Sequence, residues 1–363
     1  MSRIETQDAA KGLLPKQRRA ELNEILRGVS RSFYLTLRVV PRAMRAPLST
    51  GYLFCRAADT IADTRLLPRE ERVELLETYR AWFADETLPA AEDLKAFAAR
   101  VVGSSKVEKE RLLLERLSDC FAAYADCGAE DRDRLRRLVT TLTGGMQMDL
   151  ERFPVEESGE VDSLDTDEEL DHYCYLVAGC VGEFWTDVQC GHLRALKHWD
   201  AQEFRTRGIR FGKGLQMTNI LRDIDSDFGI GRLYIPKVAL EPAGLDAKSL
   251  RDSDDRSALR PLVHRYLKLT LDHYREGIHY TLAIPRRLVT LRLACIWPLW
   301  IGLETLTRIA QADDPCAPGV VHKITRKEVK ALMRKSSLRV GSNRALSKVT
   351  EKLEGKLLSA LEA

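Results

Sequence analysis

Residues 51–63, GYLFCRAADTIAD, contain the most informative pattern of the chain. Asp59 and Asp63 stand four residues apart, a spacing that places both carboxylates on one face of a helix. Tyr52 and Arg56 continue that polar face, since the four residues fall at i, i+4, i+7 and i+11. The flanking residues are apolar, as in a buried helix. The pattern therefore predicts polar groups gathered at a functional site rather than a solvated surface.

A second acidic face follows in residues 216–227, QMTNILRDIDSD. Gln216, Asn219, Asp223 and Asp227 fall at i, i+3, i+7 and i+11, again on one face. Carboxylates buried together need a cation to neutralise them. Mg²⁺ prefers such oxygen ligands and commonly bridges carboxylate to phosphate, and Mn²⁺ could replace it. We therefore predict that a diphosphate is held through metal ions by Asp59, Asp63, Asp223 and Asp227.

Cations that suit a diphosphate stand beside both acidic faces. Arginine binds phosphate oxygens in a bidentate way and stays charged. Each of these residues taken alone could equally be a surface cation. The candidates are Arg31, Arg56, Lys213, Arg222 and Arg232.

Composition excludes several other classes of protein. The chain of 363 residues has 57 Lys and Arg against 54 Asp and Glu, so its charge of +3 gives no reason to expect nucleic acid. Eight cysteines without a Cys-x-x-Cys pair predict free thiols in a reducing compartment. Residues 1–16 lack the apolar core of a signal peptide, and 291–303 are too short to span a bilayer. A cytoplasmic protein is expected, with contact to a membrane surface left open; nothing in the sequence indicates an oligomeric state.

Helical periodicity runs through nearly every long segment, and no stretch alternates like a strand. An all-α fold is therefore predicted, with a polar tail over 1–20 and one domain over 21–363. Residues 227–255 are predicted to be an irregular loop that closes over the site as a lid. The predicted helices cover 17–38, 46–64, 69–84, 106–126, 130–152, 167–196, 201–225, 257–283, 286–312 and 326–361.

Five ordered motifs resemble the squalene and phytoene synthase family over roughly residues 25–335. They are Ser30-Arg31-Ser32-Phe33, Tyr52 to Asp59 (YLFCRAAD), Gly144 to Asp149 (GGMQMD), Tyr173 to Gly179 (YCYLVAG) and Gln216 to Asp223 (QMTNILRD). The resemblance implies a single-domain isoprenoid-synthase helical fold with a central cavity. It also implies that the two aspartate helices face each other at the mouth of that cavity.

The resemblance further implies a head-to-head condensation of two farnesyl diphosphates. Loss of diphosphate from one molecule gives an allylic cation, the other molecule's double bond attacks it, and proton loss leaves presqualene diphosphate. Tyr173 is implied as the proton-transfer and cation-stabilising residue, together with Arg56 and the four aspartates as catalytic residues. The implied substrate-binding residues are Ser30, Arg31, Phe33, Tyr52, Arg56, Val177, Gln216, Asn219, Arg222 and Arg232.

The fate of presqualene diphosphate separates the branches of the family. Residues 323–333 resemble a basic segment near the end of squalene synthases, which favours reduction by NADPH to squalene. No Gly-x-Gly-x-x-Gly motif occurs, so Lys323 and Arg326 are the candidate ligands of the NADPH phosphates. The alternatives are a phytoene or dehydrosqualene synthase without reductant, a non-catalytic helical relative, and a class I terpene cyclase. Ala62 and Ser226 stand where eukaryotic squalene synthases carry an extra acid, which leaves the number of metal ions open.

Overall fold

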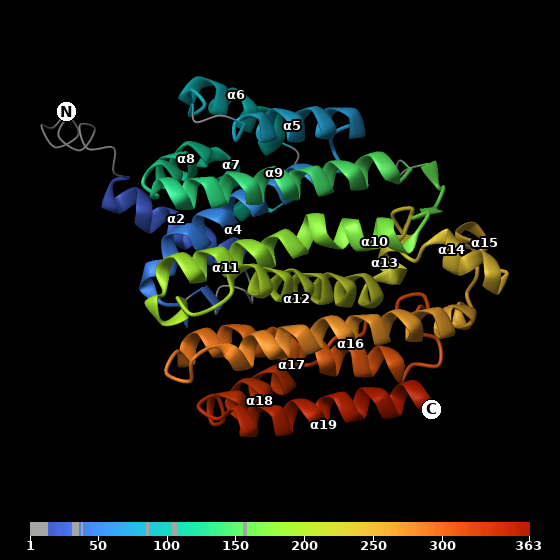
Figure 1. Ribbon diagram of the computed structural model, residues 1–363. Helices are drawn as coiled ribbons and strands as arrows, with labels where there is room; N and C mark the ends of the chain where they lie inside the picture. The colour runs from blue at the N-terminus through green and yellow to red at the C-terminus, as the bar shows by residue number, and fades with distance from the viewer. Residues whose placement is uncertain (1–13, 31–35, 38, 85–86, 104–106, 155–157) are drawn as a thin grey trace, which may run out of the picture. The chain divides into compact units, whose positions relative to one another are not determined.

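The computed structural model describes residues 14–30, 36–37, 39–84, 87–103, 107–154 and 158–363. They form two compact units, the first made of 1–150 with 187–193 and the second of 151–186 with 194–363. Helices make up both units, which confirms the all-α prediction (Figure 1). The β-structure of the described residues is one parallel pair, β1 (Asp162–Ser163) and β2 (Arg232–Leu233), which the sequence did not predict.

The first unit divides into more helices than the periodicity predicted. The helix expected over 106–126 is two, because the backbone leaves helical geometry at Arg116 (φ −105°, ψ 19°). A further helix, α6, was not predicted, although its buried residues Leu94, Phe97, Ala98 and Val101 have the spacing of an amphipathic helix. The helices are α2 (Lys16–Val29), α4 (Arg42–Ala62), α5 (Arg69–Ala81), α6 (Ala91–Val102), α7 (Glu108–Glu115), α8 (Leu117–Ala125) and most of α9 (Ala129–Arg152).

An aromatic cluster fixes α4 in the first unit. Phe54 is fully buried, and its ring centroid lies 5.0 Å from those of Phe83 and Phe121. The Tyr79 hydroxyl donates to the Phe54 carbonyl at 3.0 Å. Because Phe54 packs on one side of α4, the polar residues two to nine positions later are held on the other sides of the same rigid helix.

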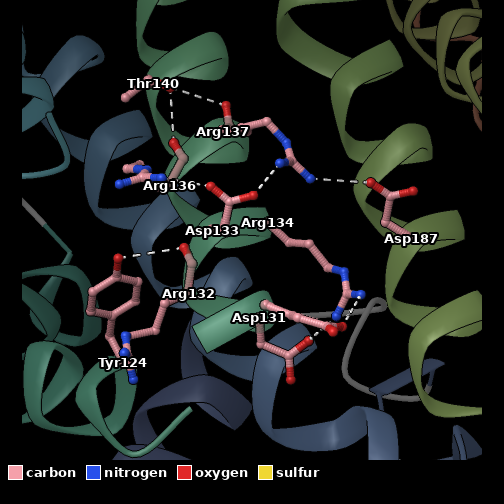
Figure 2. A network of polar contacts seen from close by, with 10 residues as sticks. Tyr124, Asp131, Arg132, Asp133, Arg134, Arg136, Arg137, Thr140 and Asp187 are labelled. Atoms are coloured by element: carbon pink, nitrogen blue, oxygen red, sulfur yellow. Dashed lines mark hydrogen bonds and ion pairs between the residues drawn. The ribbon is translucent and has the colours of Figure 1, made fainter. Parts of the chain in front are cut away.

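The end of α11 (Cys180–His192) belongs to the first unit because polar contacts tie it to α9. Figure 2 shows Arg137 of α9 extended toward Asp187, to whose carboxylate it donates a hydrogen bond at 3.4 Å. Closer to the helix end, Nε2 of His192 lies 2.8 Å from a carboxylate oxygen of Asp131. These contacts position the last two turns of α11.

The second unit also corrects predicted boundaries. Residues 167–196 are interrupted by a five-residue π-helix, 326–361 are broken at 338–342, and the expected loop 227–255 contains short helices. The elements are α10 (Asp167–Cys174), the π-helix η3 (Tyr175–Gly179), the rest of α11, η4 (Arg194–Leu196), α12 (Ala201–Arg222), α13 (Ile224–Phe228), α14 (Lys237–Leu240), η5 (Glu241–Ala243), α15 (Ala247–Arg251), η6 (Ser257–Leu259), α16 (Arg260–Ala283), α17 (Val289–Ala310), α18 (Arg326–Ser337) and α19 (Asn343–Glu362).

Glycines allow α12 to lie against η3 and α11 with the backbones in contact. A Cβ placed on Gly212 would overlap the carbonyl oxygen of Ala178, and one on Gly208 would lie 2.6 Å from the carbonyl oxygen of Gly182. On its other side α12 packs on α16, where the Tyr274 hydroxyl lies 2.6 Å from that of Thr218. These contacts determine which face of α12 is left for the acidic motif.

The apolar helix α17 is a core element of the second unit. By length and composition it is, among the described residues, the one helix that could cross a membrane, but 67% of its most apolar window is buried. It packs against α12, α16, α18 and α19 (Figure 1). Its fully buried Arg292 donates to the Val340 carbonyl at 2.9 Å and to the Asn343 side chain at 2.6 Å. These hydrogen bonds belong to a folded core.

Candidate active site

The first half of the candidate site lies at the C-terminal end of α4. Asp63 caps the helix, and its N–H donates to the Asp59 carbonyl at 2.9 Å. The helical hydrogen bonding therefore reaches Asp63, so both aspartates keep the i, i+4 relation predicted for them. Thr60 and Thr64, buried on the opposite side, donate to backbone carbonyls one turn earlier and reinforce this last turn.

Arg56 forms a bridge between two carboxylates at this helix end. One arm of its guanidinium hydrogen bonds to Asp59 and the other to Glu110 of α7. Burial lowers the pKa of Arg56, but the charges of Asp59 and Glu110 outweigh it and raise that pKa. The fork of Arg56 is thereby held in one orientation beside the two aspartates.

Asp59 lies in an environment that disfavours its negative charge. Although 37% of its side chain is exposed, burial of the carboxyl group and the charge of Asp63 raise its pKa to about 6, against the opposing effect of Arg56. A divalent cation would relieve this repulsion. The pair of oxygen donors thus fits Mg²⁺ better than a soft metal.

Two of the four other residues predicted near α4 lie in the described part of the chain, and both hydrogen bond to backbone carbonyls. The Tyr52 hydroxyl donates to the Val29 carbonyl at 3.3 Å, so Tyr52 joins α4 to the end of α2. Ser30 is buried and its hydroxyl bonds to the Leu26 carbonyl. Arg31 and Phe33 lie outside the described residues.

The second half of the site lies where α12 gives way to α13. Asp223 separates the two helices (φ −106°, ψ 13°) and is not part of one continuous helix as predicted. The hydrogen bonds nevertheless continue, from Asp223 N–H to the Asn219 carbonyl at 2.9 Å and from Asp227 N–H to the Asp223 carbonyl at 3.0 Å. The Asn219 amide also donates to the Gln216 side chain at 3.4 Å. The four predicted residues therefore follow one another along consecutive helical turns.

An arginine again accompanies the first aspartate of the pair. Both Nε and Nη2 of Arg222 donate to the carboxylate of Asp223, with the Nε bond at 2.8 Å. This hydrogen bonding raises the pKa of Arg222, whereas its burial acts in the opposite direction. Each half-site thus has two aspartates and an arginine that hydrogen bonds to the first of them; Arg222 is bidentate on Asp223, whereas Arg56 bridges Asp59 and Glu110.

Asp225, the extra acid of this motif, has a structural role. Its carboxylate receives a hydrogen bond from Arg256 at 2.7 Å and another from the Gly319 N–H at 2.8 Å. Arg256 is buried and also lies over the Phe228 ring, 4.6 Å from its centroid. Asp225 therefore anchors α13 to the segment that follows α17.

Tyr173 forms an aromatic pair that the sequence did not reveal. It is the penultimate residue of α10 and is buried, with its ring stacked on that of Tyr234 at a centroid distance of 4.9 Å and an angle of 21°. The two hydroxyls are 3.2 Å apart. Phe153 packs edge-on against Tyr234 at 5.2 Å. A stacked pair with joined hydroxyls can both stabilise a cation and pass a proton.

The remaining candidates are distributed over the second unit. Val177 lies within η3, so the π-helical backbone sets the orientation of its side chain. Arg232 is the first residue of β2 and pairs with Asp162 of β1. Lys323 and Arg326 are exposed at the start of α18. Lys213 forms an ion pair with Asp171 at 2.6 Å, which links α12 to α10.

Glu110 and Tyr234 are the residues that sequence reasoning missed. Glu110 lies in a surface-like, charged helix, and only the fold brings it to Arg56. Tyr234 follows the short strand β2 in a stretch predicted to be an irregular loop. The apolar run Leu233-Tyr234-Ile235 was the one signal that this stretch is buried.

Each unit offers two aspartates as candidate metal ligands. Among the residues that the structure describes, no cluster of three or more His, Cys, Asp or Glu could hold a metal by itself. A metal held by two carboxylates per half-site would keep positions for substrate oxygens and water. The prediction that the two aspartate pairs share one cavity stays a prediction, as does the single domain over 21–363.

Comparison with known proteins identifies the family of this chain. Residues 26–331 match the squalene/phytoene synthase family. The presqualene diphosphate synthase of Rhodopseudomonas palustris is 32% identical over 265 residues, 71% of this chain and 77% of that protein. The presqualene diphosphate synthase of Sinorhizobium fredii is 30% identical over 279 residues, 74% of this chain and 81% of that protein.

A solved structure supports the fold. The complex of TcSQS with the ligand BPH1237 has a TM-score of 0.73, with 22% identity over 96% of this chain and 99% of that chain. The chain has the all-helical fold of isoprenoid synthases, and its family match defines it as a prenyl transferase. This chain belongs to the squalene/phytoene synthase family.

Proposed function

We propose that the protein condenses two molecules of farnesyl diphosphate head to head into presqualene diphosphate. The observation that carries the proposal is the repeated half-site, two aspartates with an arginine hydrogen bonded to the first of them, in a chain 32% identical to a presqualene diphosphate synthase. Each half-site can hold one diphosphate group, and the reaction uses two.

The chain's own residues have distinct roles in this reaction. Asp59 and Asp63, like Asp223 and Asp227, would hold the Mg²⁺ ions, which when bound supply charge neutralisation for the departing diphosphate. Arg56 and Arg222 contribute bidentate donors for phosphate oxygens.

The tyrosine pair acts on the hydrocarbon part of the substrate. An outer ring face of the stacked Tyr173–Tyr234 pair stabilises the allylic cation, and the joined hydroxyls relay the proton lost as the cyclopropane closes to the released diphosphate. Because each hydroxyl gives up one proton as it accepts another, both tyrosines stay neutral and the diphosphate ends protonated.

Reduction of presqualene diphosphate to squalene with NADPH is the second candidate activity. The basic segment 323–333 favours it, with Lys323 and Arg326 as the proposed contacts to the cofactor phosphates. The alternative without a reductant, a phytoene or dehydrosqualene synthase, would release a desaturated hydrocarbon.

One experiment tests these proposals together. The protein is incubated with farnesyl diphosphate and Mg²⁺, with and without NADPH, and the products are identified by mass spectrometry. Presqualene diphosphate as the product without NADPH supports the main proposal, and its conversion to squalene on adding NADPH supports the second. A desaturated C30 hydrocarbon formed without NADPH would contradict the second proposal and favour a dehydrosqualene synthase, whereas the absence of any product that joins two farnesyl units would contradict the main proposal.

A further inference from the structure

Charge is distributed very unevenly along this chain. Residues 323–363 contain eleven Lys and Arg against four Glu, a formal charge of +7, although the whole chain carries only +3. Residues 1–322 therefore carry −4. A segment of 41 residues with such an excess indicates attraction to a polyanionic partner.

The structure arranges these cations on helix surfaces. In α18 the exposed stripe follows the spacing i, i+3, i+7, i+11 with Lys327, Lys330, Arg334 and Leu338. The opposite face packs Leu332 and other residues against α17. Among the described residues the three cations of the stripe take part in no ion pair, so their charge is directed to the surroundings.

Helix α19 extends the basic surface. Arg344, Lys348, Lys352 and Lys356 are exposed at intervals of four residues, while the buried face of α19 packs on α17. Of these, Lys356 is bound to an acid, Glu304, at 3.1 Å. Figure 1 shows α18 and α19 as successive helices beside α17.

The cations of the two helices are close enough to repel one another. Partial burial lowers the pKa of Lys335 in α18, and the charges of Lys352 and Arg339 lower it further. Such repulsion costs stability, and an anionic surface laid against the helices would remove it.

Exposed apolar side chains lie among these cations. Leu338, at the end of the α18 stripe, is 84% exposed, and Val321, shortly before α18, is 59% exposed. Leucine and valine next to lysines are the composition of a helix that rests in a lipid interface. A dissolved nucleotide or a nucleic acid would leave these apolar groups in water.

We propose that α18 and α19 form a docking surface for an anionic phospholipid membrane. The lysines and arginines contact lipid phosphates, and Leu338 and Val321 enter the headgroup region. The benefit of such docking rests on the proposed function, because a product with two farnesyl chains partitions into lipid. The surface itself is argued from charge and exposure alone.

The test is sedimentation of the full-length protein with vesicles, without substrate. Vesicles of phosphatidylcholine with 30% phosphatidylglycerol are compared with pure phosphatidylcholine, at low and at high salt. We expect binding to the anionic vesicles that weakens as salt rises. The triple variant Lys327→Glu, Lys330→Glu, Arg334→Glu should bind on the order of 100-fold more weakly.

A matched control carries the same change of charge elsewhere. Lys95→Glu, Lys197→Glu, Lys248→Glu alters three exposed lysines outside α18 and α19 and should keep most of the binding. Leu338→Gln should reduce binding by a smaller factor, and circular dichroism verifies folding of each variant. Equal binding to both vesicle types, or equal losses in the two triple variants, would overturn the docking surface.

The two proposals fail separately. A protein that makes presqualene diphosphate but ignores anionic vesicles contradicts the docking surface alone. A protein that binds the vesicles but does not join farnesyl diphosphate contradicts the proposed function and leaves the docking surface standing.

Discussion

Three acids within five residues have different roles at the α12–α13 junction. Among the described residues, the carboxylate of Asp223 is hydrogen bonded by its neighbour Arg222, whereas that of Asp225 is hydrogen bonded by Arg256 and Gly319. We expect Asp223→Asn to lower the rate of presqualene diphosphate formation by at least about 100-fold. Asp225→Asn is the matched control and should lower the melting temperature instead. Initial rates at several Mg²⁺ concentrations separate the two effects; near-normal activity of Asp223→Asn would refute metal ligation there.

Glu110 orients Arg56 from a different helix. With Glu110→Gln the guanidinium loses one of its two carboxylate partners and becomes less well positioned for phosphate. We expect kcat/KM for farnesyl diphosphate to fall about tenfold, with an unchanged melting temperature. Glu110→Asp should restore part of the loss if orientation is the cause. A variant with wild-type kcat and KM would show that Glu110 has no part in the reaction.

Substitutions in the Tyr173–Tyr234 pair distinguish a role in packing from a role in proton transfer. Tyr173→Phe and Tyr234→Phe each keep the stacked rings and remove one hydroxyl of the 3.2 Å contact. We expect both variants to fold and to make presqualene diphosphate at least about tenfold more slowly. Their rates are compared with that of the double variant. If proton transfer runs through both hydroxyls, the double loss should hardly exceed a single one, whereas multiplied effects would indicate independent roles.

At the scale of helices, α12 depends on the absence of side chains at its contact with η3. We expect Gly212→Ala to lower the free energy of unfolding by about 1–3 kcal/mol, because the new methyl group meets the Ala178 carbonyl. Gly355→Ala in α19 is the matched control, since its Cβ would meet nothing within 4 Å; it should stabilise by about 0.5–1 kcal/mol. Urea unfolding measures both, and equal effects would disprove the close contact.

At the scale of the whole molecule, pH should act through a histidine in the core of the second unit. Burial, with the charges of Arg210 and Lys213, lowers the pKa of His273 to about 4. In the unfolded chain His273 therefore becomes protonated near pH 6.5, whereas in the folded protein it stays neutral until the pH approaches 4. Stability should be lost as the pH falls from about 6.5 to about 4, by on the order of 2 kcal/mol.

The variant His273→Gln should remove most of this pH dependence. His279→Gln is the control, since it changes an exposed histidine of the same helix, α16. Urea unfolding at pH 7 and pH 5 provides the free energies. An unchanged difference between the two pH values in His273→Gln would show that other groups cause it.

Local patterns in the sequence were sufficient to establish the fold class, the family and the position of both aspartate pairs. This was possible because helical periodicity and i, i+4 spacing are local, and local geometry survives in almost any tertiary context.

The partners of the functional residues depend on the tertiary structure. Glu110 reaches Arg56 from 54 positions away, and Tyr234 reaches Tyr173 from 61 positions away. The π-helix after Tyr173 and the break at Asp223 follow from backbone contacts with neighbouring helices, which periodicity does not record. Side-chain pairs of this kind depend on how helices pack, because contacts between distant segments, and not the spacing within one, select the partner of each charge and ring.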